Sequence, residues 1–106
     1  MAARTIIVTG SNKGIGRGIV EEVLKTCPEF TKVILTARNL ELGNATVAEI
    51  NATGDFASRL HLMQLDIANA ESISNFASEF SANHGKVDVL VNNAGFAYKN
   101  DVKNTF

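Results

Sequence analysis

The chain has 106 residues, of which 45% are hydrophobic and 20% are charged, and its formal net charge is −1. This length allows one domain, and the balance of apolar and charged residues is typical of a folded globular protein, which excludes a disordered chain. The near-neutral charge argues against nucleic acid or an acidic membrane surface as a partner, and no stretch approaches the about 18 apolar residues that a membrane span needs.

Apolar runs alternate with helical patterns along the chain. Runs rich in Val and Ile predict buried parallel strands, and apolar residues spaced three and four apart predict helices. Pro28 ends the first helix because a proline restricts the residue before it. The expected order is a strand at 5–9, a helix at 15–27, a strand at 32–37, a helix at 40–53, a strand at 60–65, a helix between the cap Asn69 and Gly85, and a strand at 87–91.

Each predicted helix has an apolar face that is expected to cover the sheet. Ile15, between two glycines, is expected to point into the core, and Cys27 is expected to be a core residue. As the single cysteine, Cys27 also excludes an internal disulfide framework and favours a reducing compartment, so we expect a cytoplasmic location. The predicted faces are Ile15, Ile19, Val20, Val23, Leu24 and Cys27 in the first helix, Leu40, Val47, Ala48 and Ile50 in the second, and Ile73, Phe76, Ala77 and Phe80 in the third.

The alternation of strands and helices predicts an α/β fold. Each right-handed crossover lays its helix on a sheet face, which gives a Rossmann-like doubly wound parallel sheet with the order βαβαβαβ. The chain ends soon after the fourth strand. We therefore expect residues 1–106 to be the N-terminal part of one such domain, truncated after the fourth strand.

Three glycines lie between the first strand and the first helix, in the stretch VTGSNKGIGRGIV. A helix N-terminus carries unpaired N–H groups and a partial positive charge, so it attracts phosphate. Gly10 suits a tight turn, Gly14 lets the backbone approach a pyrophosphate, and Gly16 allows close packing of helix and strand. The alternative is a plain glycine-rich turn, but its position favours a dinucleotide site.

The charges at the end of the second strand predict which dinucleotide binds. An NAD site usually places an acid about 20 residues beyond the glycine turn, whereas a 2′-phosphate requires cations. This chain has Ala37-Arg38-Asn39 there, with no acid, and Lys13 lies inside the glycine turn. We therefore expect NADP(H) as the cofactor. The alternative for both cations is a solvated surface side chain.

The motif TGSNKGIG resembles the cofactor signature of the short-chain dehydrogenase/reductase family. VDVLVNNAG, at the fourth strand, resembles the second hallmark of that family. LTAR, QLDI and NNAGFAYK resemble the NADPH-dependent carbonyl reductase branch, so the resemblance covers essentially the whole chain. It implies hydride transfer from NADPH to a small-molecule ketone, aldehyde or quinone.

The resemblance also implies roles for residues at the other strand ends. The Asp66 carboxylate would contact the adenine amino group, with Ile67 lining the ring, and Asp66 has the alternative role of capping the next helix. Asn92 is the candidate beside the cofactor, and Asn93 is expected to serve backbone geometry. The expected cofactor-binding residues are Gly10, Ser11, Asn12, Lys13, Gly14, Ile15, Gly16, Arg38, Asp66, Ile67, Asn92, Ala94 and Gly95.

No catalytic or metal-binding set can be assigned. The family uses a serine and a Tyr-x-x-x-Lys pair, but the single tyrosine, Tyr98, is followed four residues later by Val102, and Lys99 cannot replace the lysine. The family places those residues beyond the asparagine block. His61 and His84 are far apart in the pattern and have no ligand spacing, so we expect no metal site. The lysines form no basic stripe with aromatics, which also argues against nucleic acid.

Three functions follow from these expectations. The first is the cofactor-binding part of an NADPH-dependent carbonyl reductase, and the alternatives are a non-catalytic NADP(H)-binding module and an inactive truncated product. In the family that the chain resembles, the fourth strand is internal and is flanked by the first strand and by a later fifth. The resemblance therefore implies that the strand at 87–91 would here form an apolar edge with unpaired backbone groups. We therefore expect the isolated chain to be marginally stable and to self-associate through that edge.

Overall fold

The computed structural model describes residues 4–93, which form one parallel sheet with helices on both faces. The strand order is β3-β2-β1-β4, and all three strand pairs are parallel. This confirms the predicted α/β class. The elements are β1 (Arg4–Val8), α1 (Gly14–Thr26), β2 (Thr31–Ala37), α2 (Leu40–Asn51), β3 (Leu60–Gln64), α3 (Ala70–Asn83) and β4 (Val89–Val91).

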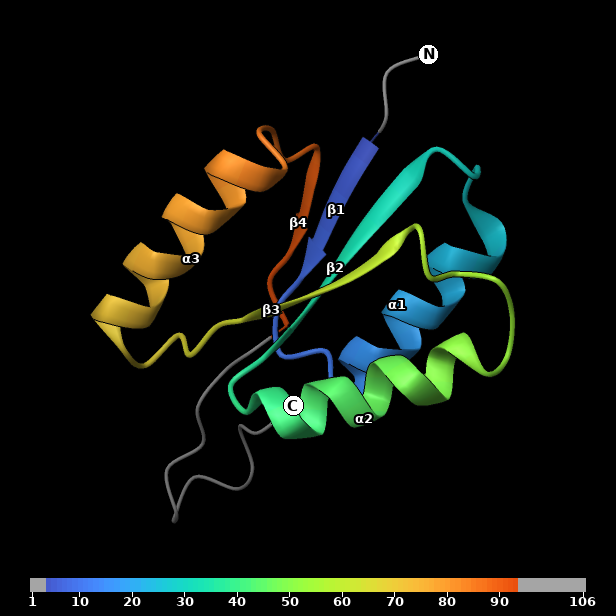
Figure 1. Cartoon of the computed structure of the whole chain (residues 1–106), viewed down its shortest axis with the longest axis horizontal. Helices are drawn as coiled ribbons and strands as arrows, with labels where there is room; N and C mark the ends of the chain where they lie inside the picture. The colour runs from blue at the N-terminus through green and yellow to red at the C-terminus, as the bar shows by residue number, and fades with distance from the viewer. Residues whose placement is uncertain (1–3, 94–106) are drawn as a thin grey trace.

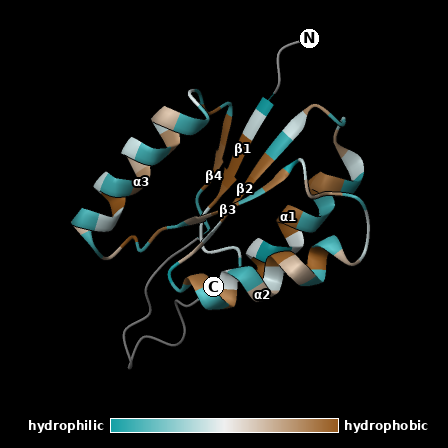
Figure 2. Ribbon diagram, in the orientation of Figure 1, coloured by the Kyte–Doolittle hydropathy of each residue, from teal (hydrophilic) through white to brown (hydrophobic). Residues whose placement is uncertain are grey.

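The helices are divided unequally between the two sheet faces. Figure 1 shows α1 and α2 side by side on one face and α3 on the other. Figure 2 shows the strands as the most hydrophobic part of the described chain. A larger core lies under α1 and α2, and a smaller one lies under α3. The larger core contains Ile6, Val8, Val20, Leu24, Val33, Leu35, Ile50 and Leu60, and the smaller contains Ile7, Ile34, Met63 and Phe80.

Two predicted helix boundaries are confirmed by their caps. The Asn69 side chain accepts a hydrogen bond from the backbone N–H of Ser72 at 3.0 Å, so Asn69 is the N-cap of α3. Helix α1 ends before Pro28, with Cys27 in an extended conformation. Cys27 is half-buried at this cap rather than in the core, which corrects the prediction.

Parts of all three predicted helix faces are wrong. Ile15 is 68% exposed, because the buried line of α1 runs through Gly16, Val20 and Leu24. In α2, Leu40 and Ala48 are exposed, and in α3, Ile73 and Ala77 are exposed. The buried residues of α2 are Gly43, Thr46 and Ile50, and those of α3 are Ser72 and Phe80.

The fourth strand begins later than predicted. Val87 is exposed and lies outside β4. Asp88 pairs with Thr5 through its side chain as well as its backbone, because its carboxylate accepts the Thr5 N–H at 2.8 Å while its own N–H donates to the Thr5 carbonyl at 2.9 Å. Regular strand pairing with β1 therefore starts only at Val89.

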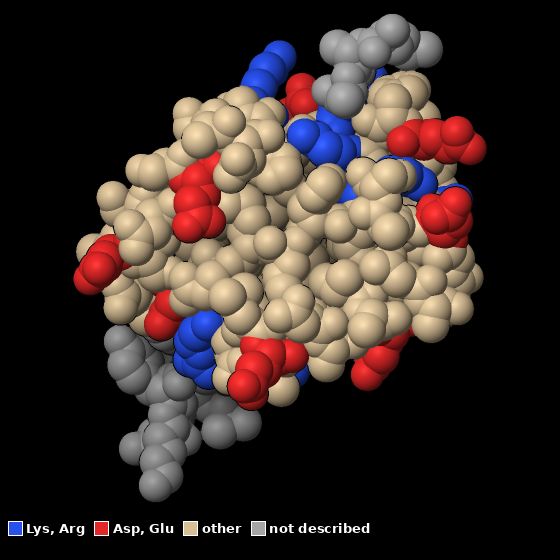
Figure 3. Space-filling model, viewed as in Figure 1, with Lys and Arg blue, Asp and Glu red and all other residues tan. Residues whose placement is uncertain are grey.

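None of the described helices is long and apolar enough to cross a membrane. Figure 3 shows acidic and basic side chains scattered around the rim of one face, without a continuous patch of either sign.

Candidate functional site

The turn from β1 into α1 leaves the N-terminus of α1 open to a ligand. Gly10 and Gly14 both have positive φ, +58° and +63°, which confirms that the turn needs glycine. Lys13 is the N-cap, but its side chain caps no N–H, and the first turn of this described helix has no acid. The partial positive charge of the helix end is therefore not neutralised by its own side chains.

Gly16 lies where no side chain fits. A Cβ built on Gly16 would lie 2.6 Å from the Asn93 amide nitrogen and 2.6 Å from the Gly10 carbonyl oxygen. The Asn93 amide donates to that carbonyl at 3.1 Å, and the Asn93 backbone N–H donates to the Thr9 hydroxyl at 2.9 Å. Close packing at Gly16 is confirmed, and the Asn93 side chain ties the end of β4 to the glycine turn.

Ser11 faces the interior. It is fully buried, and its hydroxyl donates to the Val8 carbonyl at 2.7 Å and accepts the Thr36 N–H at 3.0 Å. Thr36 in turn accepts the Gly10 N–H through its hydroxyl at 3.0 Å. The Ser11 backbone N–H also donates to the Thr36 carbonyl, at 2.9 Å. These bonds fix the start of the turn to β2 and leave both the hydroxyl and the backbone N–H of Ser11 occupied. Thr36 could not be predicted as a contact of the turn, because no short sequence motif marks a threonine inside a strand.

Two cations lie at the same edge of the sheet. Arg38 follows β2 directly, Lys13 precedes α1, and both side chains are exposed. Within residues 4–93 neither cation forms an ion pair. The Gln64 side chain donates to the Arg38 carbonyl at 3.3 Å, which links the ends of β2 and β3. Both charges therefore remain available to an anion.

Asp66 and Ile67 follow β3 and are half-buried. The Asp66 carboxylate accepts the Ala68 N–H at 3.0 Å, and its backbone N–H donates to the Ser72 hydroxyl at 2.8 Å. The helix cap is Asn69 rather than Asp66. The Asp66 side chain thus shapes the turn before α3 and does not cap that helix.

Asn92 is exposed at the end of β4. The predicted residues Ala94 and Gly95, and also Tyr98 and Lys99, lie outside the described residues.

The two histidines lie together, which their positions in the sequence did not suggest. Their ring centroids are 5.1 Å apart, and the Lys32 ammonium nitrogen lies 3.1 Å from His84 Nδ1. Burial and the charge of Lys32 both lower the pKa of each ring. No group of three or more His, Cys, Asp or Glu side chains within the described ranges is placed to hold a metal ion.

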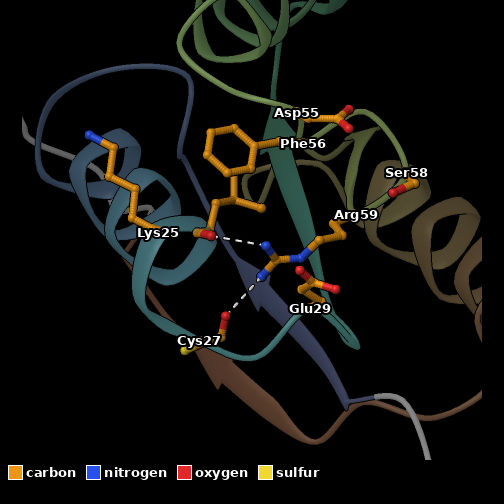
Figure 4. Close-up of a pocket in the computed structure, with 8 residues that line it drawn as sticks. Lys25, Cys27, Glu29, Asp55, Phe56, Ser58 and Arg59 are labelled. Carbon is orange, nitrogen blue, oxygen red and sulfur yellow. Dashed lines mark hydrogen bonds between the residues drawn. The ribbon is translucent and has the colours of Figure 1, made fainter.

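A pocket of about 500 Å³ lies elsewhere, beside the C-terminal end of α1. The Arg59 guanidinium occupies one wall and donates to the carbonyls of Leu24 at 2.9 Å and Thr31 at 3.0 Å, and also to those of Cys27 and Pro28. Figure 4 shows this side chain directed toward the end of the helix. These bonds give Arg59 a structural role, and the pocket shares no residue with the glycine turn.

A family model described as short chain dehydrogenase matches residues 4–105. Among curated proteins, the chain is 44% identical over 97 residues to carbonyl reductase (NADPH) 1 of Macaca fascicularis, covering 91% of this chain and 33% of that protein. It is 40% identical over 100 residues to human carbonyl reductase (NADPH) 3, covering 93% and 34%. The chain therefore spans about a third of the length of these relatives.

Solved structures of related oxidoreductases are similar to this chain in fold. Menthone neomenthol reductase from Mentha piperita matches with a TM-score of 0.81 and 31% identity, over 91% of this chain and 33% of that one. A metagenomic short-chain oxidoreductase in complex with NADP matches with a TM-score of 0.76 and 33% identity, over 94% and 42%.

Proposed function

The chain belongs to the short-chain dehydrogenase family, and from this premise we propose that it forms the cofactor-binding part of an NADPH-dependent carbonyl reductase. The reaction is hydride transfer from NADPH to a ketone, aldehyde or quinone. The observation that carries the proposal is the uncapped N-terminus of α1 at the carboxyl edge of the sheet, with Arg38 at the end of the neighbouring strand. The names of the relatives, carbonyl reductases that use NADPH, support the same reaction.

The residues at this edge fit a dinucleotide. A Cβ on Gly14 would meet nothing within 4 Å, so the turn is open on the side where a pyrophosphate would approach. In the proposed site, the turn formed by Gly10, Ser11, Asn12, Lys13, Gly14, Ile15 and Gly16 surrounds the pyrophosphate, and the buried Ser11 supports this turn from the interior. Arg38 and Lys13 bind the 2′-phosphate, Asp66 and Ile67 contact the adenine, and Asn92, Ala94 and Gly95 lie beside the rest of the cofactor.

The chemistry of the proposed site is divided between cofactor and protein. NADPH supplies the hydride when it is bound. The helix end and the two cations hold phosphate groups by charge-assisted hydrogen bonds. Asn93 keeps the Gly10 carbonyl away from the open side of the turn, because it binds that oxygen directly. The proton that completes carbonyl reduction is not assigned to Tyr98, because Val102 and not a lysine lies four residues after it.

Replacing Arg38 tests the cofactor assignment. In the intact protein that contains this sequence, Arg38→Asp should weaken NADPH at least about tenfold, because a charge-assisted contact is lost and an acid is introduced. NADH affinity should change much less, since NADH has no 2′-phosphate. The matched control is Lys25→Asp, which makes the same change of charge at the exposed C-terminal end of α1. Unchanged NADPH affinity in Arg38→Asp, measured by isothermal titration, would refute the assignment.

Turnover separates the reductase from a binding module. NADPH oxidation by the intact protein in the presence of a quinone supports the reductase. Tight NADPH binding without turnover of any ketone, aldehyde or quinone supports a non-catalytic NADP(H)-binding module instead. Absence of both supports an inactive product.

The proposal includes a cytoplasmic location and self-association of the chain. The free, half-buried thiol of Cys27 supports a reducing, cytoplasmic location. The exposed apolar side chains of Val89 and Leu90 on β4 support self-association of the 106-residue chain through that strand. The partner of the intact protein is a small carbonyl compound.

A further inference from the structure

Thr46 connects α2 to the glycine turn. It is 5% exposed, and its hydroxyl oxygen lies 2.7 Å from the Asn12 carbonyl oxygen and 3.1 Å from the Leu42 carbonyl oxygen of its own helix. A hydroxyl carries a single proton, so the shorter distance makes Asn12 the principal acceptor. The bond joins residues 34 apart in the sequence.

The position of α2 against the sheet brings Thr46 within reach of the turn. A Cβ built on Gly43, almost one helical turn before Thr46, would lie 2.7 Å from a methyl carbon of Leu62 and 3.1 Å from the Cβ of Ala37. A larger side chain at position 43 would require the Leu62 side chain to shift, so glycine favours this approach of α2 to β2 and β3. The close approach places the next buried residue of the helix, Thr46, beside Asn12.

Asn12 lies in the part of the turn that has the fewest other restraints. The residue before it, Ser11, is held by Val8 and Thr36 in the interior. Among the described residues, the bond to Thr46 is the hydrogen bond that Asn12 makes. Lys13 and Gly14, which follow, lead directly into the open end of α1. Thr46 thus holds the segment of the turn that lies next to the N-terminal N–H groups of the helix.

We propose that Thr46 is a positioning residue for the dinucleotide: its hydroxyl fixes the Asn12 carbonyl and thereby the direction of the N–H groups that bind the pyrophosphate. This inference rests on the proposed function and deepens it. A fixed turn binds phosphate without first being ordered, whereas a turn without the Thr46 bond must be ordered when the cofactor binds.

The test uses two substitutions in the intact protein. Thr46→Val keeps the shape of the side chain and removes the hydroxyl, and Thr46→Ser keeps the hydroxyl. Thr46→Val should weaken NADPH about three- to tenfold, the effect of one hydrogen bond, and Thr46→Ser should restore affinity to within about twofold of the original protein. Binding of 2′-AMP should weaken less than that of NADPH in Thr46→Val, because this fragment has the 2′-phosphate but no pyrophosphate.

The binding measurements distinguish a positioning role of Thr46 from a purely structural one. Equal weakening of NADPH and 2′-AMP by Thr46→Val, with no rescue by Thr46→Ser, would show a purely structural role and overturn the inference. Normal NADPH affinity in Thr46→Val, together with weakened NADPH in Arg38→Asp, would overturn the role of Thr46 and leave the proposed function standing. An original protein that does not bind NADPH would overturn both.

Discussion

Lys32 lies among neutral histidines, and this arrangement makes the stability of the protein sensitive to acid. The Lys32 ammonium donates to His84 Nδ1, so the neutral ring must carry its proton on the other nitrogen. The His84 ring stacks on Phe80 and meets His61, whose Nε2 is buried without a hydrogen-bond partner among the described residues. A proton added to either ring is therefore placed beside Lys32 with no described acid to balance it.

We predict that stability falls as the pH drops below about 6.5, the ordinary pKa of histidine. Burial first, and Lys32 second, lower the pKa of His61 and His84 in the folded state, so the unfolded chain binds more protons. The stability is therefore fully present above the unfolded-state pKa and is lost as the pH falls through the lowered folded-state values. Urea denaturation between pH 7.5 and about pH 5 measures the change.

The double variant His61→Gln/His84→Gln provides the control for this acid sensitivity. It should have a flatter stability profile over the same pH range, because glutamine does not titrate there. Lys32→Met should reduce the slope by a smaller amount, since burial is the larger cause of both pKa shifts. An unchanged slope in the double variant would show that other groups cause the loss of stability.

The Arg59 side chain links separate elements of the fold, because it binds both the end of α1 and the start of β2. Arg59 lies in the turn directly before β3, and its guanidinium donates to four carbonyls at the end of α1, in the following turn and at the start of β2. A cation at a helix C-terminus is also favoured by the helix dipole. A side chain from the turn before β3 thus binds carbonyls at the end of α1 that the helix itself leaves without partners.

We predict that Arg59→Met lowers the free energy of unfolding by about 2 kcal/mol, because hydrogen bonds from a charged donor to partly buried carbonyls are lost. The matched control is Arg17→Met. Arg17 bridges Glu21 at 2.8 Å and Glu49 at 2.6 Å on the surface, and such exposed ion pairs contribute about 0–1 kcal/mol. Chemical denaturation measures both variants. If both variants lost the same free energy of unfolding, the carbonyl contacts of Arg59 would contribute no more than an exposed ion pair.

The helix faces show why the pattern of apolar residues predicted the elements but not their orientation. Each first turn contains a large aliphatic residue that was expected to be buried and is exposed: Ile15 in α1, Leu40 in α2 and Ile73 in α3. The residues that face the sheet at these helix starts are small, Gly16, Gly43 and Ser72. A helix start that packs closely against the sheet requires small residues there. A prediction based on large apolar residues therefore does not identify the buried face at these positions.

At the scale of the whole molecule, the motifs predicted the fold and the position of the glycine turn. The parallel pairing follows from the alternation of elements and the handedness of crossovers, whereas this alternation does not specify the order β3-β2-β1-β4. The restraints on the turn could not be predicted in the same way. Thr36, Thr46 and the side chain of Asn93 reach the turn from three different elements or strand ends, and no local spacing connects them to it.

The open edge at β4 leads to a prediction for the 106-residue chain by itself. Among residues 4–93, strand β4 lies at one end of the sheet order, and its Leu90 is 59% exposed. An unpaired apolar strand offers backbone N–H and carbonyl groups to a second chain. We therefore expect this chain to sediment as dimers or larger species whose fraction rises with concentration.

A lysine on the edge should suppress this association. Leu90→Lys places a charge on the edge strand, where it must be desolvated if two strands pair, so the chain should shift toward the monomer in sedimentation velocity. Ile73→Lys is the matched control, because Ile73 is 45% exposed on α3 and not on the edge. Equal suppression by both variants would point to general contact between apolar surfaces instead of strand pairing. A wild-type chain that stays monomeric at every concentration would refute the role of the edge, because the same apolar strand would then be stable in water without a partner.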